Sequence, residues 1–293
     1  MASLDVLIPH FNAPEDLSVS LRSVAAQDWQ GSVRVVVVDD GSKREARAQA
    51  ARVLETFPGA STFIELAQNR GRPFTRNRLL EAVGGTHVAW LDAGDWWYPE
   101  KIRLQFEALN LAPEAHVWAT CDYDWKWTGR EATPTVQNID GDQIAALLRG
   151  DRLRAYLWTL VTPVSTLEKV GSFDESLPRL QDLDYFLRFL VGGGRLIKPA
   201  ESSPLCRYEK SDLGRAAREV RLCQERIFEK HDSVYRRYGK GFLRSCRVKA
   251  DLHAARYALN NGSYAEFGRF IGRAVLRDPL GASRWLLRKT MDR

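Results

Sequence analysis

The chain has 293 residues, of which 44% are hydrophobic and 27% charged, as is ordinary for a globular protein with one large α/β domain and a smaller appendage, or with two modest domains. No run of about 18 apolar residues occurs, which excludes a helix that spans a bilayer. The net charge of +6 is concentrated towards the C-terminus, where 21 Lys and Arg stand against 10 Asp and Glu from Arg207 onward.

Alternating strands and helices are predicted along the first 121 residues. The strands are expected at residues 4–9, 33–38, 62–66, 86–91 and 117–121, and the helices at 14–27, 43–57, 73–83 and 99–111. The second strand is almost entirely valine, which is typical of a strand buried on both faces. This order predicts an α/β fold, a mostly parallel sheet with helices on both faces, which binds ligands at the carboxyl ends of its strands.

After residue 121 the periodicity weakens. A helix is expected at 141–149, a strand at 156–162, a helix at 181–191, and basic helices from about residue 212. We expect a first domain over 1–210, with halves at about 1–120 and 121–210, and a basic helical region over 211–293. Its charge favours a phospholipid surface, a nucleic acid or a phosphate-bearing acceptor as partner, with a solvated helical face as the alternative.

The N-terminus and the cysteines indicate the compartment. No basic segment followed by an apolar stretch opens the chain, so we expect no signal peptide and a cytoplasmic protein. The cysteines are too scattered for a disulfide framework or a metal site, and free thiols are expected. They are Cys121, Cys206, Cys223 and Cys246.

Two strands end in carboxylates. Asp39 and Asp40 follow the second strand, and Asp92 and Asp95 follow the fourth. Either pair alone is also compatible with a turn or a helix start. Together, at one edge of a parallel sheet, they predict a nucleotide site with a metal, since carboxylates are the oxygen ligands that Mg²⁺ and Mn²⁺ prefer.

Three arginines lie between the two acidic strand ends. Arg70, Arg72 and Arg76 cluster where a loop leads into the N-terminus of the helix predicted at 73–83. Guanidinium groups and helix N-termini both bind phosphate, which favours a diphosphate at this loop, whereas solvated surface charge is the alternative for each single arginine.

Four short motifs occur in order and at suitable spacing: 8–12 (Ile-Pro-His-Phe-Asn), 37–42 (Val-Val-Asp-Asp-Gly-Ser), 69–77 (Asn-Arg-Gly to Arg-Asn) and 91–95 (Leu-Asp-Ala-Gly-Asp). Together they resemble family-2 glycosyltransferases, which have the GT-A fold. The resemblance covers residues 4 to about 200. It implies an inverting, hexosyltransferase-type enzyme that uses a nucleotide sugar, UDP- or another nucleoside-diphosphate sugar, as donor.

The resemblance also implies where the nucleotide and metal bind. The expected nucleotide-binding residues are Pro9, Phe11, Asn12, Asp40, Arg72, Arg76 and Asp92. Asp92 and Asp95 fall in the motif that binds Mn²⁺ or Mg²⁺. Many relatives have Asp-x-Asp-Asp there, but this chain has Gly94 at the third position, so Asp95 is expected to take over as ligand.

Asp182 matches the family's catalytic base. It would take a proton from the acceptor hydroxyl during a single displacement that inverts the anomeric carbon. Relatives usually carry Glu where this chain has Gln181, which should leave the Asp182 pKa lower than beside a second carboxylate. Without the resemblance, Asp182 would be interpreted as a helix cap.

The acceptor side is expected to use aromatic rings, on which the apolar faces of sugars stack. Trp97, Trp125 and Trp158 are the expected acceptor-binding residues, with core packing as the alternative for each. Basic amphipathic segments within 264–290 are expected to lie on an anionic membrane at its inner face, with docking onto the body or a dimer partner as the alternative.

The expected acceptor is a glycan, a lipid-linked saccharide or a polysaccharide of the cell envelope, and no nucleic acid is expected as partner. Two other functions remain open from the sequence: a catalytically inactive module that binds nucleotide sugars or glycans, and a sugar nucleotidyltransferase. The second would normally need a Gly- and Arg-rich loop after the first strand, where this chain has Pro9, Phe11 and Asn12.

Overall fold

A computed structural model describes residues 2–127, 131–201, 203–210 and 216–283. The chain divides into two compact units, Met1–Lys210 and Ser211–Arg293. Among the described helices, none combines the length and the apolar character needed to cross a lipid bilayer.

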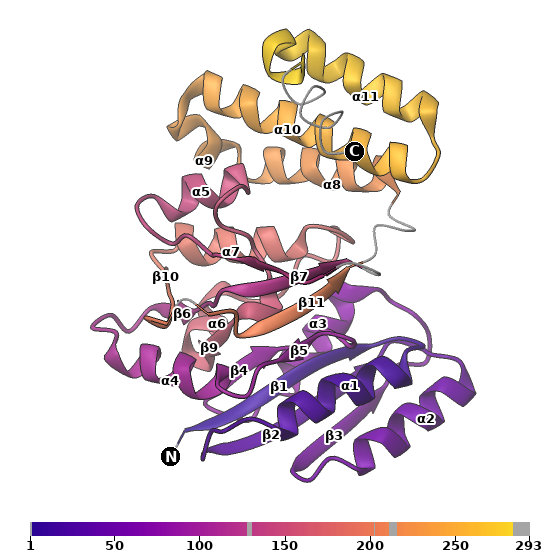
Figure 1. The fold of residues 1–293 in the computed structure, drawn as a ribbon, viewed down its shortest axis with the longest axis vertical. Helices are drawn as coiled ribbons and strands as arrows, with labels where there is room; N and C mark the ends of the chain where they lie inside the picture. Colours follow the sequence, from indigo (N-terminus) through magenta and orange to yellow (C-terminus); the bar gives the residue numbers. More distant parts are fainter. Residues whose placement is uncertain (1, 128–130, 202, 211–215, 284–293) are drawn as a thin grey trace. The chain divides into compact units, whose positions relative to one another are not determined.

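A seven-stranded sheet forms the centre of the first unit (Figure 1). Its strands, in spatial order, are β10 (Arg195–Ile197), β6 (Val117–Ala119), β9 (Val161–Pro163), β4 (His87–Trp90), β1 (Ser3–His10), β2 (Ser32–Asp39) and β3 (Ala60–Glu65). All neighbouring pairs are parallel except those of β9, which runs antiparallel to both β4 and β6. The predicted mostly parallel sheet is confirmed.

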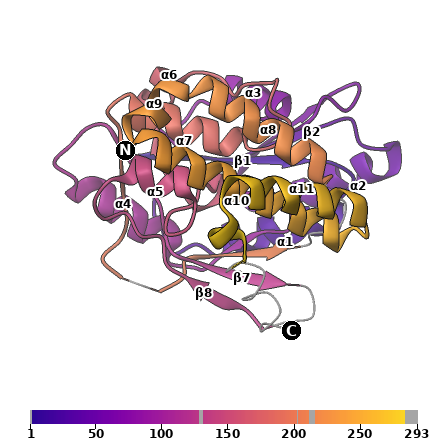
Figure 2. The same ribbon diagram turned by 90° about the horizontal axis from the view of Figure 1, so that it is seen from above.

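Helices cover both faces of this sheet (Figure 2). Leu4, Val6 and Ile8 alternate along β1 and share one apolar cluster with residues of three helices. These are α1 (Pro14–Ala25), α2 (Arg44–Glu55) and α4 (Lys101–Leu111). On the opposite face α3 (Arg72–Glu81) contacts β1 and β2.

A second, four-stranded sheet was not predicted. It has the order β5 (Trp96–Trp97), β11 (Cys206–Lys210), β7 (Tyr123–Trp127) and β8 (Thr133–Thr135). Its strands have two to five residues, and one of its two central strands, β11, pairs with segments about 80 to 110 residues away in sequence. Such short strands carry no periodicity that a sequence pattern can detect.

The predicted strand at 156–162 is only partly correct. Residues Leu157–Thr159 form a 3₁₀ turn, closed by a 2.9 Å hydrogen bond from Leu160 N–H to the Leu157 carbonyl. The strand that was predicted here is β9, which begins only at Val161. The remaining helices of this unit are α5 (Gln143–Arg149), α6 (Val164–Val170) and α7 (Gln181–Val191). α5 and α7 were predicted, and α6 was not.

The second unit is helical, with α8 (Ala217–Lys230), α9 (Asp232–Arg237), α10 (Gly239–Asn260) and α11 (Tyr264–Arg277). α10 and α11 lie side by side, and alanines of α10 pack with Phe270 and Phe267 of α11 (Figures 1 and 2). Asp251 is fully buried here and pairs with Arg221, Arg273 and Arg277. Of the range 264–290 expected to bind a membrane, residues 284–290 lie outside the described residues.

All four cysteines are free and buried, which confirms the prediction of free thiols.

Candidate active site

The carboxyl ends of three adjacent parallel strands lie at one edge of the large sheet. In the order β4, β1, β2, these strands end at Trp90, His10 and Asp39. The loops that follow them contain the ends of the predicted motifs at 8–12 and 37–42 and most of the motif at 91–95. The topology therefore brings the two acidic strand ends together with the N-terminal loop, as the sequence predicted.

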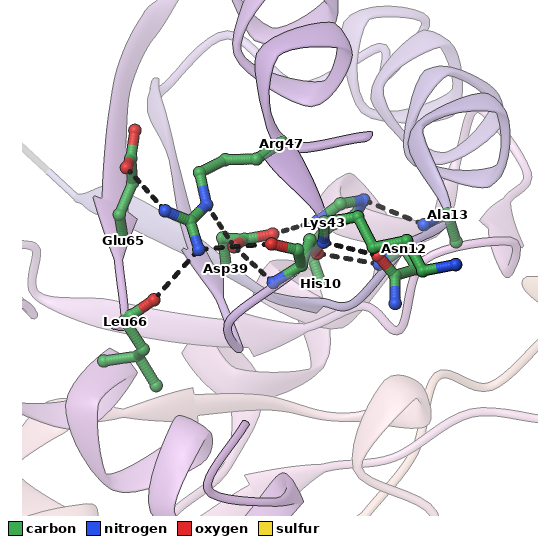
Figure 3. Close-up of polar contacts among 9 residues, drawn as sticks. His10, Asn12, Ala13, Asp39, Lys43, Arg47, Glu65 and Leu66 are labelled. Atoms are coloured by element: carbon green, nitrogen blue, oxygen red, sulfur yellow. Dashed lines mark hydrogen bonds and ion pairs between the residues drawn. The ribbon is translucent and has the colours of Figure 1, made fainter. Parts of the chain in front are cut away.

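A buried polar network holds the first two loops (Figure 3). His10 Nδ1 lies 2.8 Å from Asp39 Oδ1, and Asp39 Oδ2 accepts bonds from Ser42 N–H at 3.0 Å and Arg47 Nε at 3.1 Å. Burial acts to raise the pKa of Asp39, but the bonds from His10 and Ser42 outweigh it and hold this pKa below its usual value. Asp39 is therefore an ionised structural anchor.

Asn12 joins the same two loops. Its backbone has a φ of 52°, in the left-handed region that asparagine tolerates. Its N–H donates to Ser42 Oγ at 2.8 Å, and its Oδ1 accepts from Lys43 N–H at 2.8 Å. Pro9 is half-buried beside it, and Phe11 is 47% exposed at the strand end. An exposed aromatic ring on a rigid loop is suited to stacking on a flat ligand.

Asp40 fixes the arginine-rich loop. Its two carboxylate oxygens accept bonds from the backbone N–H groups of Arg70 at 2.7 Å and Gly71 at 3.0 Å. Gly41 has a φ of +71°, and a Cβ there would come within 2.3 Å of the Gln68 carbonyl carbon, so the two loops touch through backbone. Asp40 is thus tied to the loop that begins α3, and each oxygen retains a lone pair for a ligand donor.

Arg76 and Arg72 lie in different environments. The Arg76 side chain is only 2% exposed, and its guanidinium bonds to Asp182 through Nη1 and to Asp92 through Nη2, at 3.2 Å from Asp92 Oδ1. Arg72, one turn earlier on α3, is exposed. Of these two candidates for a diphosphate contact, only Arg72 is open to a ligand in this structure.

The two carboxylates bound by Arg76 differ in their acidity. Burial acts to raise the pKa of Asp92, but the charges of Arg76 and Arg72 outweigh it and hold this pKa below its usual value. Burial raises the pKa of Asp182, and the neighbouring Asp92 charge adds to this rise in spite of Arg76. One carboxylate is therefore firmly ionised, and the other is the better proton acceptor.

The helix-cap alternative for Asp182 does not describe its contacts. α7 begins at Gln181, so Asp182 lies in the first turn, and its carboxylate bonds to Arg76. The residue before the helix, Leu180, has a φ of 62°, which is costly for a residue with a Cβ.

The acidic motif after β4 offers a metal one accessible carboxylate. The Asp92 side chain is 27% exposed, whereas Asp95 is only 4% exposed. Gly94 has a φ of +99°, which favours glycine over the aspartate of relatives at this position. Among the residues that the structure describes, no group of three or more His, Cys, Asp or Glu side chains could hold a metal ion. A cation that also binds phosphate oxygens needs only one or two protein carboxylates, and Asp92 fits that requirement.

The predicted aromatic acceptor residues separate by exposure. Trp97 is 1% exposed in the core, with the Lys101 ammonium 4.4 Å from its ring centroid. Trp158 is 4% exposed and stacks between two tyrosines. Burial of both rings matches the core-packing alternative and corrects the expectation that they face an acceptor. Trp125, on β7, is half-buried, so of the three rings it is the one that an acceptor could still reach.

Several residues of the site carried no clear sequence signal. Nothing in the sequence indicated that His10 pairs with Asp39, or that Arg47 reaches across to Asp39 and Glu65 (Figure 3). Asn77 was noticed only as part of a motif. Its side chain donates to the Phe173 carbonyl at 3.1 Å and accepts from Phe173 N–H at 2.7 Å, which holds the segment before α7 against α3.

Comparisons with known proteins find glycosyltransferases. The family model described as glycosyl transferase family 2 matches residues 5–149. The chain is 30% identical over 141 residues to the uncharacterized glycosyltransferase YibD of Escherichia coli, covering 48% of this chain and 39% of that protein. It is 26% identical over 190 residues to the uncharacterized glycosyltransferase RP339 of Rickettsia prowazekii, covering 64% and 58%. The chain thus spans less than two thirds of the length of these relatives.

Solved structures share the fold. Mannosyltransferase PcManGT from Pyrobaculum calidifontis, in complex with GDP-Man and Mn²⁺, superposes with a TM-score of 0.60 at 19% identity, covering 98% of this chain and 79% of that one. S. aureus TarS 1-349 in complex with UDP gives 0.58 at 16% identity, covering 92% and 88%. At these identities the likeness shows the fold alone, and it confirms the expected GT-A architecture.

Proposed function

This chain belongs to glycosyl transferase family 2 through its residues 5–149, and on that premise we propose that it transfers a sugar from a nucleoside-diphosphate sugar to a hydroxyl acceptor. One observation carries the proposal: Arg76 joins Asp92, from the end of β4, to Asp182, from the start of α7. A donor-side and an acceptor-side carboxylate thereby meet at the strand edge where α/β sheets bind ligands.

The donor nucleotide is held by the three loops at this edge. Pro9, Phe11 and Asn12 lie against the nucleoside, and the remaining lone pairs of Asp40 accept hydrogen bonds from it. The exposed Arg72 contacts the diphosphate. The nucleotide complexes of TarS with UDP and UDP-GlcNAc, and of PcManGT with GDP-Man, support a nucleotide-sugar donor for a chain of this fold.

A divalent cation, Mn²⁺ or Mg²⁺, would be held by Asp92 together with oxygens of the donor diphosphate. When bound, it neutralises charge that develops on the leaving nucleoside diphosphate. The Mn²⁺ in the PcManGT complex supports this assignment. Asp95 is buried, and its N–H donates to the Asp92 carbonyl at 3.0 Å. Its role is therefore to hold the loop that carries Asp92 more readily than to bind the metal ion.

Asp182 serves as the general base. It accepts the proton of the acceptor hydroxyl while that oxygen forms a bond to the anomeric carbon and the bond from this carbon to the diphosphate oxygen breaks. One displacement of this kind inverts the anomeric centre. The raised pKa of Asp182 supports the role, because a stronger base takes the proton more readily.

The acceptor is a saccharide or a lipid-linked saccharide of the cell envelope, which the half-buried ring of Trp125 would contact. The second unit by itself is suited to an anionic membrane surface, because α11 carries the exposed Arg269 together with Leu276, which is 87% exposed.

The test is a donor screen. The protein is incubated with UDP-GlcNAc, GDP-Man and other nucleotide sugars, with Mn²⁺, with Mg²⁺ or with a chelator, and release of nucleoside diphosphate is measured. We expect saturable release with at least one donor. Binding without release would instead support an inactive binding module, and formation of pyrophosphate from a nucleoside triphosphate and a sugar phosphate would support a nucleotidyltransferase.

A further inference from the structure

Arg76 is a buried cation between two carboxylates that come from distant parts of the chain. Its Nη2 lies 3.2 and 3.4 Å from the two Asp92 oxygens, and its Nη1 bonds to Asp182 Oδ1. Its Nε has no hydrogen-bond partner among the described residues. The guanidinium carbon lies 5.8 Å from the centroid of the Phe173 ring. Both charged contacts of this side chain are therefore carboxylates of the candidate site.

The burial of Arg76 separates it from the donor phosphates. Its side chain is 2% exposed, while those of Asp92 and Asp182 are 27% and 22% exposed. A ligand can thus reach both carboxylates from solvent, but it cannot reach the guanidinium behind them. Arg72, one turn earlier on the same helix, is exposed. The prediction that Arg72 and Arg76 contact the diphosphate is therefore easier to reconcile with the exposed Arg72 than with the buried Arg76.

The chemistry of arginine suits a fixed link between two acids. A guanidinium stays charged at every physiological pH and donates in a rigid planar fork, so it orients both carboxylates at once. It also neutralises the repulsion that would otherwise separate them. Because Asp182 Oδ1 is occupied by Arg76, and Oδ2 has no hydrogen-bond partner among the described residues, Oδ2 is the oxygen left for an acceptor hydroxyl.

The next residue strengthens the same link. Asn77 holds Phe173 by two backbone bonds and also donates to Glu175 Oε1 at 3.0 Å. Two consecutive residues of α3 therefore fix the segment that leads into α7, and α7 itself. The position of the base is set from the donor side of the site.

We propose that Arg76 is a positioning residue for the transfer reaction: it holds Asp182 Oδ1 so that Oδ2 faces the acceptor hydroxyl, and it couples this base to the donor-side Asp92. The inference rests on the proposed function. It assigns Arg76 an action through Asp182, with little direct effect on donor binding.

The experiment compares Arg76→Gln and Arg76→Lys with wild type, and uses Arg78→Gln as matched control. Arg78 lies on the same helix, is 43% exposed and pairs only with Glu81 among the described residues. For Arg76→Gln we expect kcat to fall about 100-fold, as for a misplaced catalytic group, while the donor Kd changes less than about threefold. Arg76→Lys should recover part of kcat, and Arg78→Gln should behave as wild type.

A double-mutant cycle with Asp182→Asn separates positioning from general damage. If Arg76 acts through Asp182, Asp182→Asn should reduce kcat little further in the Arg76→Gln background. Additive losses, an unchanged kcat in Arg76→Gln, or a donor Kd that weakens as much as kcat would each overturn the proposal. If the melting temperature shows that Arg76→Gln does not fold, the same double-mutant cycle is measured with Arg76→Lys. An inactive wild-type protein would contradict the proposed function itself. This result is distinct from an active wild type whose kcat does not change when Arg76 is replaced, which would contradict only the role of Arg76.

Discussion

His10 Nδ1 lies 2.8 Å from Asp39 Oδ1, with both side chains fully excluded from solvent. Ala13 N–H donates to the other ring nitrogen, Nε2, at 3.2 Å, so the ring carries its hydrogen on Nδ1 and donates it to Asp39. The pair joins the ends of β1 and β2 beneath the loops that are proposed to hold the nucleoside. The bond between His10 and Asp39 therefore stabilises the strand ends that carry the candidate site, and we assign it a structural role.

Replacement of His10 by Phe should destabilise the fold. The ring volume is kept, but Asp39 loses a buried donor, and the free energy of unfolding should fall by about 3 kcal/mol. Urea denaturation measures this loss. His87→Phe is the matched control, since His87 lies on β4, is half-buried and packs against Phe106, and it should change stability far less. Equal stabilities for the two variants would contradict the interpretation.

Stability should fall in acid through Asp5. Burial acts to raise the pKa of Asp5, but the bonds from Arg34, Gly84 N–H and Gly85 N–H outweigh it and hold this pKa below its usual value. A group with a lowered folded-state pKa stabilises the fold above its unfolded pKa of about 3.9, and this stabilisation is lost as the pH falls towards the folded-state pKa.

Asp5→Asn should therefore be less stable than wild type at pH 7, and the difference should shrink as the pH falls below about 4. Thermal unfolding at a series of pH values measures this. A difference that stays constant, or that grows in acid, would refute the assignment.

Asp40→Ala should weaken nucleotide binding by two routes. It removes a carboxylate proposed to contact the nucleoside, and it releases the backbone of Arg70 and Gly71 at the start of α3. We expect the Kd for the preferred nucleoside diphosphate to rise about 10-fold or more, a loss of about 1.4 kcal/mol, by calorimetry. Glu55→Ala, at the exposed C-terminal end of α2, is the control. Unchanged affinity in Asp40→Ala would remove Asp40 from the site.

Trp125→Ala should weaken acceptor use and leave donor binding intact. Loss of a partly exposed aromatic platform is expected to raise the acceptor KM about 10-fold, measured with a saccharide that supports diphosphate release. Trp97→Ala is the contrasting variant. It empties a core position and should lower the free energy of unfolding by about 3–5 kcal/mol. A Trp125→Ala enzyme with normal acceptor kinetics would exclude this ring from the acceptor site.

The large sheet could be predicted because its strands are locally encoded. The valines of β2 and the alternation of Leu4, Val6 and Ile8 along β1 require burial whatever the rest of the chain does. The small sheet could not be predicted in this way. Trp96 and Trp97 pair with Arg207 and Cys206, a contact between segments about 110 residues apart that no local pattern encodes.

The candidate site shows the same division. The positions of Asp40 and Asp92 at strand ends followed from the element order, since parallel strands bring their carboxyl ends to one edge. The environment of Arg76 did not, because sequence motifs carry residue type and spacing but not burial. Two arginines four residues apart on α3 have different surroundings, Arg72 exposed and Arg76 enclosed by carboxylates.

The most direct test of the account measures nucleoside diphosphate release by Asp182→Asn beside wild type, with donor Kd measured for both. The variant keeps the size of the side chain and removes its basicity. We expect turnover to fall at least about 100-fold while the donor Kd changes no more than about twofold, as for loss of a general base. Undiminished turnover in Asp182→Asn would contradict the proposed reaction at this site.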